Sequence, residues 1–303
     1  MLTRAAAACA ALSPLMALAQ DATDWQTKAG GKMEFEVASV RVDRGEFTPP
    51  NFPLDAGDAY RPVGNRFFAD FPLATFITFA YKLALSPEQR EAMLARLPKW
   101  VASDRYRIQA HAQGTPTKDQ MRLMMQSLLA ERFKLTAHFE TQEVPVLALV
   151  LVKPGKTGPK LIPHADGPPC DAASQDADSS RPRSAEVFPP VCNIVVLDVP
   201  RNGLLRTGSR DTTLDLIAPV ISQFGRTGKP VVNQTGLNGR VDFSLEWQQE
   251  PDGSAPPGSG VQPQVEGPAF LDALREQLGL KLESTRGLVR TLVIDHVERP
   301  SDN

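Results

Sequence analysis

The feature that most constrains the fold is an order of elements that occurs twice along the chain. Residues 68–153 predict a strand, a helix, a strand, a second helix and two further strands, and residues 204–297 predict the same order. Self-similarity of this kind decides the domain organisation before any site is sought. The sequence therefore predicts an α+β protein of two related β-α-β-α-β-β subdomains, at residues 33–155 and 199–300, each a sheet with helices packed on one face.

Local signals support the predicted helices. Thr117 and Gln120 form a capping-box pattern before a helix whose apolar stripe is Met121, Met124, Met125 and Leu128. We interpret that stripe as core, although a methionine cluster is also typical of an adaptable binding groove. Gly279 fits the position just after the last helix. Pro219 falls inside a helix predicted to begin near Thr212, where it would cost about 3 kcal/mol, so we expect a kink or a late start.

Two stretches are too rich in proline, glycine and polar residues to form a core. Residues 156–198 are predicted to be a linker between the subdomains, and residues 250–268 a flexible insertion in the second subdomain. Residues 21–32 are polar, and we expect them to be loosely ordered. Residues 35–40 then alternate apolar and polar side chains, which predicts the first strand.

The beginning of the chain has the pattern of a cleavable signal peptide. Arg4 precedes an apolar stretch at residues 5–19 that ends in small residues, so residues 1–19 are predicted to be removed by cleavage after Ala19. The stretch is shorter than the roughly 20 apolar residues that a membrane-spanning helix needs. No later segment has the length or the apolar character to span a bilayer. The sequence thus predicts a periplasmic or secreted protein.

The cysteine count agrees with export. Cleavage would remove Cys9 and leave Cys170 and Cys192, an even pair that normally oxidises outside the cytosol. We predict a disulfide within the linker, worth on the order of 3 kcal/mol through restriction of the unfolded chain. A redox-active pair, or a metal site that also uses His164, is the alternative.

The charge pattern excludes one class of partner. The formal net charge is −2, and the basic residues are scattered among acidic ones. A nucleic-acid interface needs a basic stripe that replaces the counterions of phosphates. We therefore expect no nucleic-acid partner.

The sequence contains none of the common catalytic motifs. It has no Gly-x-Ser-x-Gly elbow, no His-Glu-x-x-His pair and no Ser-x-x-Lys motif, and residues 225–230 lack the Ser or Thr that completes a phosphate-binding loop. Asp295 and His296 are adjacent, but neighbouring residues of a strand point to opposite faces. We interpret His296 as a strand residue. No catalytic residue, cofactor or metal site is predicted.

Two clusters of aromatic and basic residues remain as candidate binding surface. They are Trp100, Arg105 and Tyr106 in the first subdomain, and Arg240 and Trp247 at the equivalent place in the second. Trp, Tyr and Arg dominate the energetics of protein interfaces when they are exposed. The alternative is that Trp100 and Trp247 are partly buried wedges that close each subdomain, since large aromatic side chains are highly buried on average.

Several short motifs in the same order closely resemble a soil-associated bacterial family of exported proteins of unknown function. The motifs lie at residues 35–40, 97–100, 120–122, 128–135, 235–239, 276–282 and 293–300. The domain of this family is also found fused to membrane metallopeptidases of the antibiotic-sensor type. The resemblance implies a sensing or interaction role outside the cytoplasm. Each half also resembles, more weakly, the short N-terminal modules of secretins and TonB-dependent receptors, which contact other proteins.

The function expected from the sequence is a non-catalytic interaction or sensing module whose partner is another envelope or secreted protein. One alternative is a secreted hydrolase with a dispersed site, which should bring Asp295, His296, Arg132 and Glu131 together in one cleft. A second is a small-ligand sensor, which requires an apolar pocket between the halves.

Overall fold

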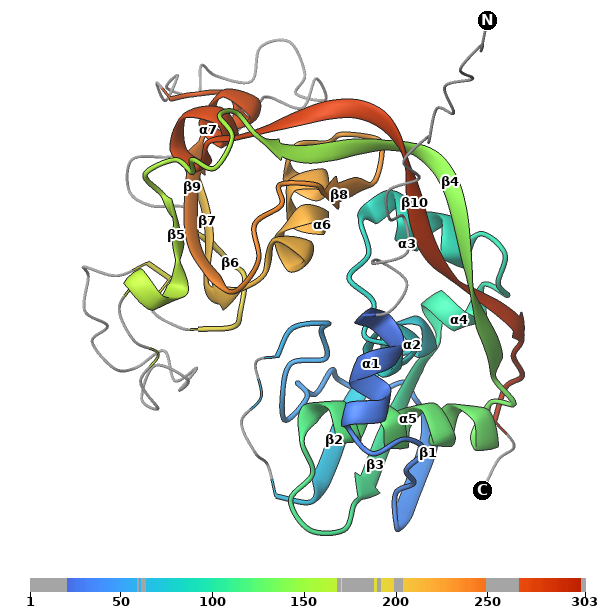
Figure 1. Cartoon of the computed structure of the whole chain (residues 1–303). Coiled ribbons are helices and arrows are strands. Elements are labelled where there is room, and N and C mark those ends of the chain that lie inside the picture. Colours follow the sequence, from blue (N-terminus) through green and yellow to red (C-terminus); the bar gives the residue numbers. More distant parts are fainter. Residues whose placement is uncertain are drawn as a thin grey trace, which may run out of the picture.

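The computed structural model describes most of the chain after the predicted signal peptide. The described residues are 21–58, 60, 64–167, 170, 188–189, 192–198, 204–248 and 267–300. The predicted signal peptide and most of the predicted insertion lie outside these ranges. Helices and strands are mixed along the described chain, which confirms the α+β class (Figure 1). No helix among the described residues has the length and apolar character to cross a membrane.

The first half is built on a three-stranded antiparallel sheet in the order β1-β3-β2. Its strands are β1 (Val37–Asp43), β2 (Arg66–Pro72) and β3 (Arg105–His111). Its helices are α1 (Asp21–Lys28), α2 (Leu73–Ala80), α3 (Pro87–Leu94), α4 (Trp100–Ser103) and α5 (Lys118–Arg132). Apolar side chains of α2, α5 and the sheet share one core, because alternate residues of β3 face both helices.

The second half is built on a four-stranded sheet in the order β5-β9-β7-β6. Its strands are β5 (Leu161–Pro163), β6 (Val196–Asp198), β7 (Leu205–Thr212) and β9 (Val241–Trp247). A short 3₁₀ turn, η2 (His164–Asp166), follows β5, and the helices are α6 (Leu214–Phe224) and α7 (Phe270–Leu278). The apolar faces of both helices pack with β9 in a second core.

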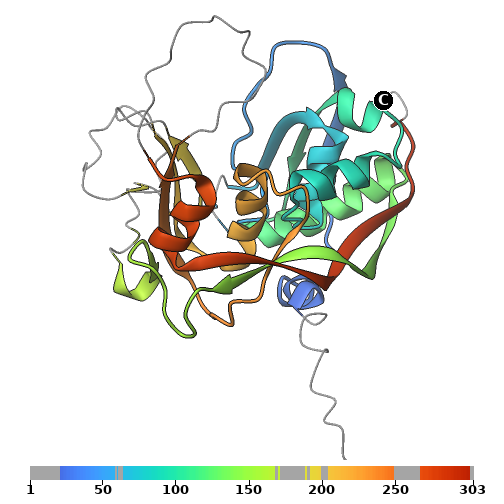
Figure 2. The same cartoon turned by 90° about the horizontal axis from the view of Figure 1, so that it is seen from above.

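Two long strands join the halves. β4 (Thr136–Leu151) and β10 (Leu280–His296) pair antiparallel over nearly their whole length, and β8 (Val231–Asn233) adds to β4 in parallel. They form a curved ribbon from α7 in the second half to the end of α5 in the first (Figure 1), and the ribbon runs along one side of both halves (Figure 2). The sequence predicted two separate strands in each of these places. That prediction is wrong, because each pair is one continuous strand.

The order of elements in the two halves is similar but does not by itself establish a duplication. β2, α2, β3, α5 and β4 in the first half match β7, α6, β9, α7 and β10 in the second. The first half also has α3 and α4 between its matching elements, and the second half has β8. Descent from one repeated unit therefore stays a prediction.

The ends of the helices follow from local chemistry. Thr117 accepts a hydrogen bond from the backbone N–H of Gln120, whose side chain accepts one from the backbone of Thr117, as the capping box predicts. Gly279 ends α7 with a φ of 68°, and a Cβ there would lie 2.5 Å from the backbone nitrogen of Gly158. Glycine is needed at this turn for both reasons.

Two local expectations can be compared with the structure. Residues 21–28 form the helix α1 where loose chain was expected, and α1 packs beside α5. A hydrogen bond between the side chains of Gln26 and Gln126, 3.2 Å long, ties the two helices together. α6 begins at Leu214 and continues through Pro219 to Phe224.

Polar contacts between described residues tie the halves to each other away from the ribbon. The guanidinium of Arg240, just before β9, lies 3.1 Å from a carboxylate oxygen of Asp58 in the first half. The hydroxyl of Ser222 on α6 donates to the carboxylate of Glu88 on α3 across 3.1 Å. The halves therefore contact each other at side chains as well as through the shared strands.

Candidate functional site

Two of the predicted contact residues lie inside the protein. Tyr106 has no exposed surface, and its ring meets that of Phe133 edge to face with centroids 5.0 Å apart. Trp247 is 3% exposed and packs between Phe224 and Phe270. The structure therefore corrects the prediction that these two residues belong to a binding surface. Both occupy core-facing positions of their strands.

The other three predicted contact residues are engaged within the protein. Trp100 is half-buried and packs against the first core. Arg105 lies 3.6 Å from the carboxylate of Asp43. Arg240 pairs with Asp58, as described above. The five residues therefore do not form one continuous exposed surface.

The residues named for a hydrolase form separate pairs. His296 is exposed, and its Nε2 lies 2.8 Å from the carboxylate of Glu298. Asp295 instead bonds Nδ1 of His138 on β4 at 2.9 Å, and this contact raises the pKa of His138. Arg132 pairs with the glutamate that precedes it, 3.3 Å away. These pairs do not assemble a nucleophile and a base.

A buried carboxyl group on β2 also has the signature that often marks catalysis. Burial, and then the neighbouring Asp43 carboxylate, raise the pKa of Asp70. However, Asp70 has no exposed surface, and Arg105 and Arg107 each approach it to 3.8 Å. Because no substrate can reach this carboxyl group, we assign it to the fold.

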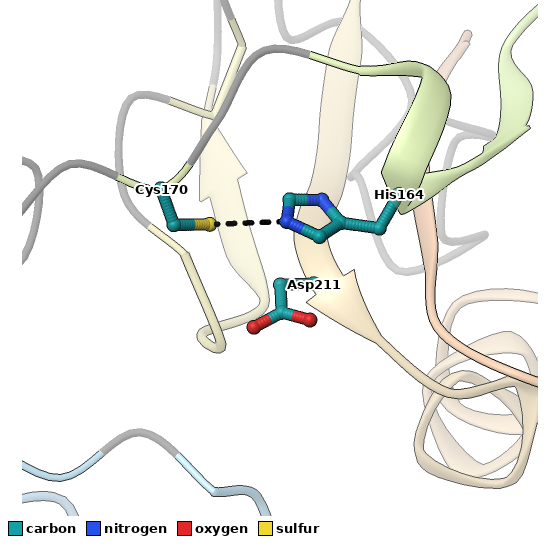
Figure 3. Close-up of side chains that lie close together, drawn as sticks. All are labelled: His164, Cys170 and Asp211. Atoms are coloured by element: carbon teal, nitrogen blue, oxygen red, sulfur yellow. Dashed lines mark hydrogen bonds between the residues drawn. The ribbon is translucent and has the colours of Figure 1, made fainter.

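A second polar cluster gathers on the second half, where η2, β7 and β9 meet. His164 opens η2 directly after β5, and its Nδ1 lies 2.6 Å from Oδ1 of Asp242 on β9. Its Nε2 lies 3.6 Å from Sγ of Cys170 (Figure 3). Asp211 faces the same point from β7, with ligand atoms of His164, Cys170 and Asp211 all within 4.8 Å of one another. These residue types are typical metal ligands.

The structure places Cys170 and Cys192 at disulfide distance, with Cα atoms 6.0 Å apart. This separation lies within the range that the bond requires. While the disulfide is formed, Cys170 cannot serve as a metal ligand.

We expect the pair to be oxidised in protein recovered from an oxidising compartment. In a chain with Cys9→Ser, thiol titration under denaturing and non-reducing conditions should then find no free thiol. Detection of two free thiols would contradict the pairing.

A groove lies between α3 and the middle of the β4/β10 ribbon; we call it the α3 groove. Its volume is about 370 Å³, and Pro230 of the second half is one of its lining residues. Its walls are mainly apolar, and they include Leu83, Leu85, Met93, Leu97, Val144, Val289, Leu292 and Ile294. The volume lies in the range of about 300–1,000 Å³ that is usual for small-molecule sites. The groove is thus a candidate ligand site to which both halves contribute.

Arg290 is the unusual side chain in this groove. It projects from β10, and its guanidinium carbon lies 3.7 Å from the centroid of the Phe139 ring. Burial lowers the pKa of Arg290, although a guanidinium stays charged in proteins. Nη1 is buried and has no hydrogen-bond partner among the described residues. Glu88 and Glu140 also line the groove, but no carboxylate among the described residues forms an ion pair with Arg290. A partly buried guanidinium without an ion-pair partner is a position that an anion would stabilise.

Glu88 connects the groove to the second half. Burial works against its ionisation, but hydrogen bonds from Ser86, its own backbone, Ser222 and the backbone of Gly228 together lower the pKa of Glu88. Its carboxylate therefore stays charged and bonded to α6 while it lines the groove. The side chain of Glu88 therefore both contacts the second half and forms part of the groove wall.

By its fold, this chain is an α+β protein in which a shared ribbon joins two cores. A mainly apolar groove lies where the two halves meet. The chain belongs to a family described as a protein of unknown function (DUF3738), which it matches over residues 74–297. The match runs from α2 to the end of the ribbon, so it includes the groove. It confirms the predicted resemblance to a family whose function is uncharacterised. Comparisons with curated proteins and with solved structures found no match.

Proposed function

We propose that this protein is an exported, non-catalytic sensing module that binds a small amphipathic anion in the α3 groove. The observation that carries the proposal is the charged side chain of Arg290 in a mainly apolar cavity of about 370 Å³. A ligand with one carboxylate or sulfonate group would give Arg290 the ion-pair partner that it lacks among the described residues. Its apolar body would displace water from the walls, and burial of apolar surface favours binding.

The position of the groove between the two halves supports a sensing role. Leu94 of α3 and the groove residues Leu292 and Ile294 of β10 pack with the first core. Pro230 belongs to the second half. The hydrogen bond between Glu88 and Ser222 crosses between the halves at the same place. A ligand that fits one relative position of the halves better than another shifts the population toward it. An envelope or secreted protein that distinguishes the two positions would then be the partner.

Export is the part of the proposal that rests on the sequence. The signal-peptide pattern at residues 1–19 and the pair Cys170 and Cys192 support it. Cell fractionation of the native host, with N-terminal sequencing of the recovered protein, tests it. A chain that keeps Met1 and stays in the cytoplasm would contradict export.

Arg290→Gln should weaken the binding of an amphipathic anion by about tenfold or more. A hydrogen bond to a charged group contributes about 1.5–3 kcal/mol, and 1.4 kcal/mol corresponds to a factor of about ten in affinity. The probe is anilinonaphthalene sulfonate, followed by fluorescence and displaced by decanoate. Arg286→Gln is the matched control, because Arg286 is on the same strand and pairs with exposed Glu143 outside the groove.

A second variant tests the position of the ligand without changing its charge partner. Ala92 lines the groove from α3 and is exposed, so Ala92→Trp should fill the cavity and leave the fold intact. We expect this variant to lose probe binding as well. Equal affinities in the wild type, Arg290→Gln and Ala92→Trp would refute the α3 groove as the site.

A further inference from the structure

The cluster around His164 has the arrangement of a metal site whose ring is already oriented. An ionised carboxylate can only accept a hydrogen bond, so Asp242 favours the tautomer with the proton on Nδ1. In that tautomer the lone pair of Nε2 faces Sγ of Cys170. Histidine ligands of metal ions typically donate their other ring N–H to a carboxylate in this way. Zinc bonds of about 2.0–2.3 Å place two tetrahedral ligand atoms roughly 3.5 Å apart. The 3.6 Å between Nε2 and Sγ agrees with that separation.

Asp211 is brought to the same point by an irregularity of its strand. The pairing of β7 with β9 shifts register between Ser209 and Thr212, and Asp211 has a φ of 52°. Bulges of this kind redirect side chains and are common beside functional sites. The backbone N–H of Asp211 donates to the carboxylate of Asp242, so the bulge is tied to the residue that orients His164.

The charges around the site change with the state of the cysteines. In the disulfide form, Asp211 and Asp242 face two arginines: Arg240 hydrogen-bonds Asp211, and Arg210 lies 3.8 Å from Asp242. Arg240 also pairs with Asp58, so three carboxylates meet two guanidinium groups and the net negative charge is small. Two thiolates would add two negative charges, which is the charge that a divalent ion compensates.

We propose that Cys170 and Cys192 switch this site between a disulfide and a zinc-type metal site. A dithiol reductant gives two electrons and two protons to the disulfide, whose S–S bond breaks to give two thiols while the reductant becomes a disulfide. A divalent transition-metal ion then displaces both thiol protons. It is bound by Sγ of Cys170 and Cys192 and by Nε2 of His164, and Asp211 supplies an oxygen ligand. This site is separate from the α3 groove and does not depend on its function.

The test uses cobalt as a spectroscopic stand-in for zinc. The full chain with Cys9→Ser is reduced by a dithiol, freed of reductant without oxygen, and titrated with Co²⁺. We expect one equivalent to bind and to produce the absorption band of thiolate-to-cobalt charge transfer, which Zn²⁺ abolishes. The oxidised protein should produce no such band.

Variants show whether the proposed ligands hold the ion. His164→Ala should weaken Co²⁺ binding by about tenfold or more, and Asp242→Asn should weaken it through the lost orientation of the ring. His138→Ala, an exposed histidine on β4, should change nothing. A reduced protein that produces no band, an unchanged affinity in His164→Ala, or loss of the far-UV circular dichroism signal on reduction would each overturn the proposal.

Discussion

Arg122→Met should lower the free energy of unfolding by about 3–5 kcal/mol, because it removes one side of a buried ionic network. Arg122 on α5 has no exposed surface, and its guanidinium donates to the backbone carbonyl oxygens of Asp55 and Gly57 at 2.8 Å each. It also hydrogen-bonds the carboxylate of Asp119. Burial is the main cause that lowers the pKa of Arg122, yet the group remains charged. Methionine keeps the volume but leaves both carbonyl groups without their donor.

The same change should loosen the contact between the halves. The loop that Arg122 holds continues to Asp58, whose carboxylate pairs with Arg240 of the second half. Urea unfolding followed by circular dichroism measures the loss of stability. Arg275→Met is the control, since Arg275 on α7 is 60% exposed and, within the described part of the chain, pairs only with Asp272 one turn away. It should cost no more than about 0.5 kcal/mol, and an equally small loss in Arg122→Met would contradict the role of the network.

Helix ends and core stripes were predictable because they depend on neighbours in the sequence. Thr117 and Gln120 cap α5, and its four stripe residues are buried. The ribbon was not predictable in this way. In its middle, around Pro145 and Gly287, most side chains are exposed or half-exposed, because there the strands pass from one core to the other. Polar residues, proline and glycine at this point resemble a turn in sequence, and only long-range pairing keeps the strands continuous.

The candidate sites depended on the same distinction. Alternation along β9 leaves Val241, Phe243, Leu245 and Trp247 buried, so the pattern itself could have placed Trp247 in the core. Arg290 carried a weaker signal, because it is the single charge in the mainly apolar run of residues 288–294. The convergence of His164 and Asp242 carried none, because 78 residues separate them.

Trp247→Ala should destabilise the protein by about 3–5 kcal/mol, the usual cost of removing a large aromatic side chain from a core. The ring of Trp247 lies 5.3 Å from the rings of both Phe224 and Phe270, and it is 3% exposed. Trp247→Phe keeps an aromatic ring in the same place, and we expect it to cost less than half as much.

The two variants also show whether the halves unfold together. Each leaves Trp25 and Trp100 as the remaining tryptophans, and both belong to the first half. Their fluorescence therefore reports on the first half while the mutation acts on the second core. β4 contributes Phe139 to the first core and Leu149 to the second, and β10 contributes Leu292 to the first and Leu280 to the second. Because both strands pack in both cores, unfolding of one core should destabilise the other. In urea, the fluorescence midpoint and the circular dichroism midpoint of Trp247→Ala should therefore decrease together. Both midpoints should lie below those of Trp247→Phe. A fluorescence midpoint that stays unchanged would mean that the ribbon does not couple the halves, and sensing across the α3 groove would then lack its mechanical basis.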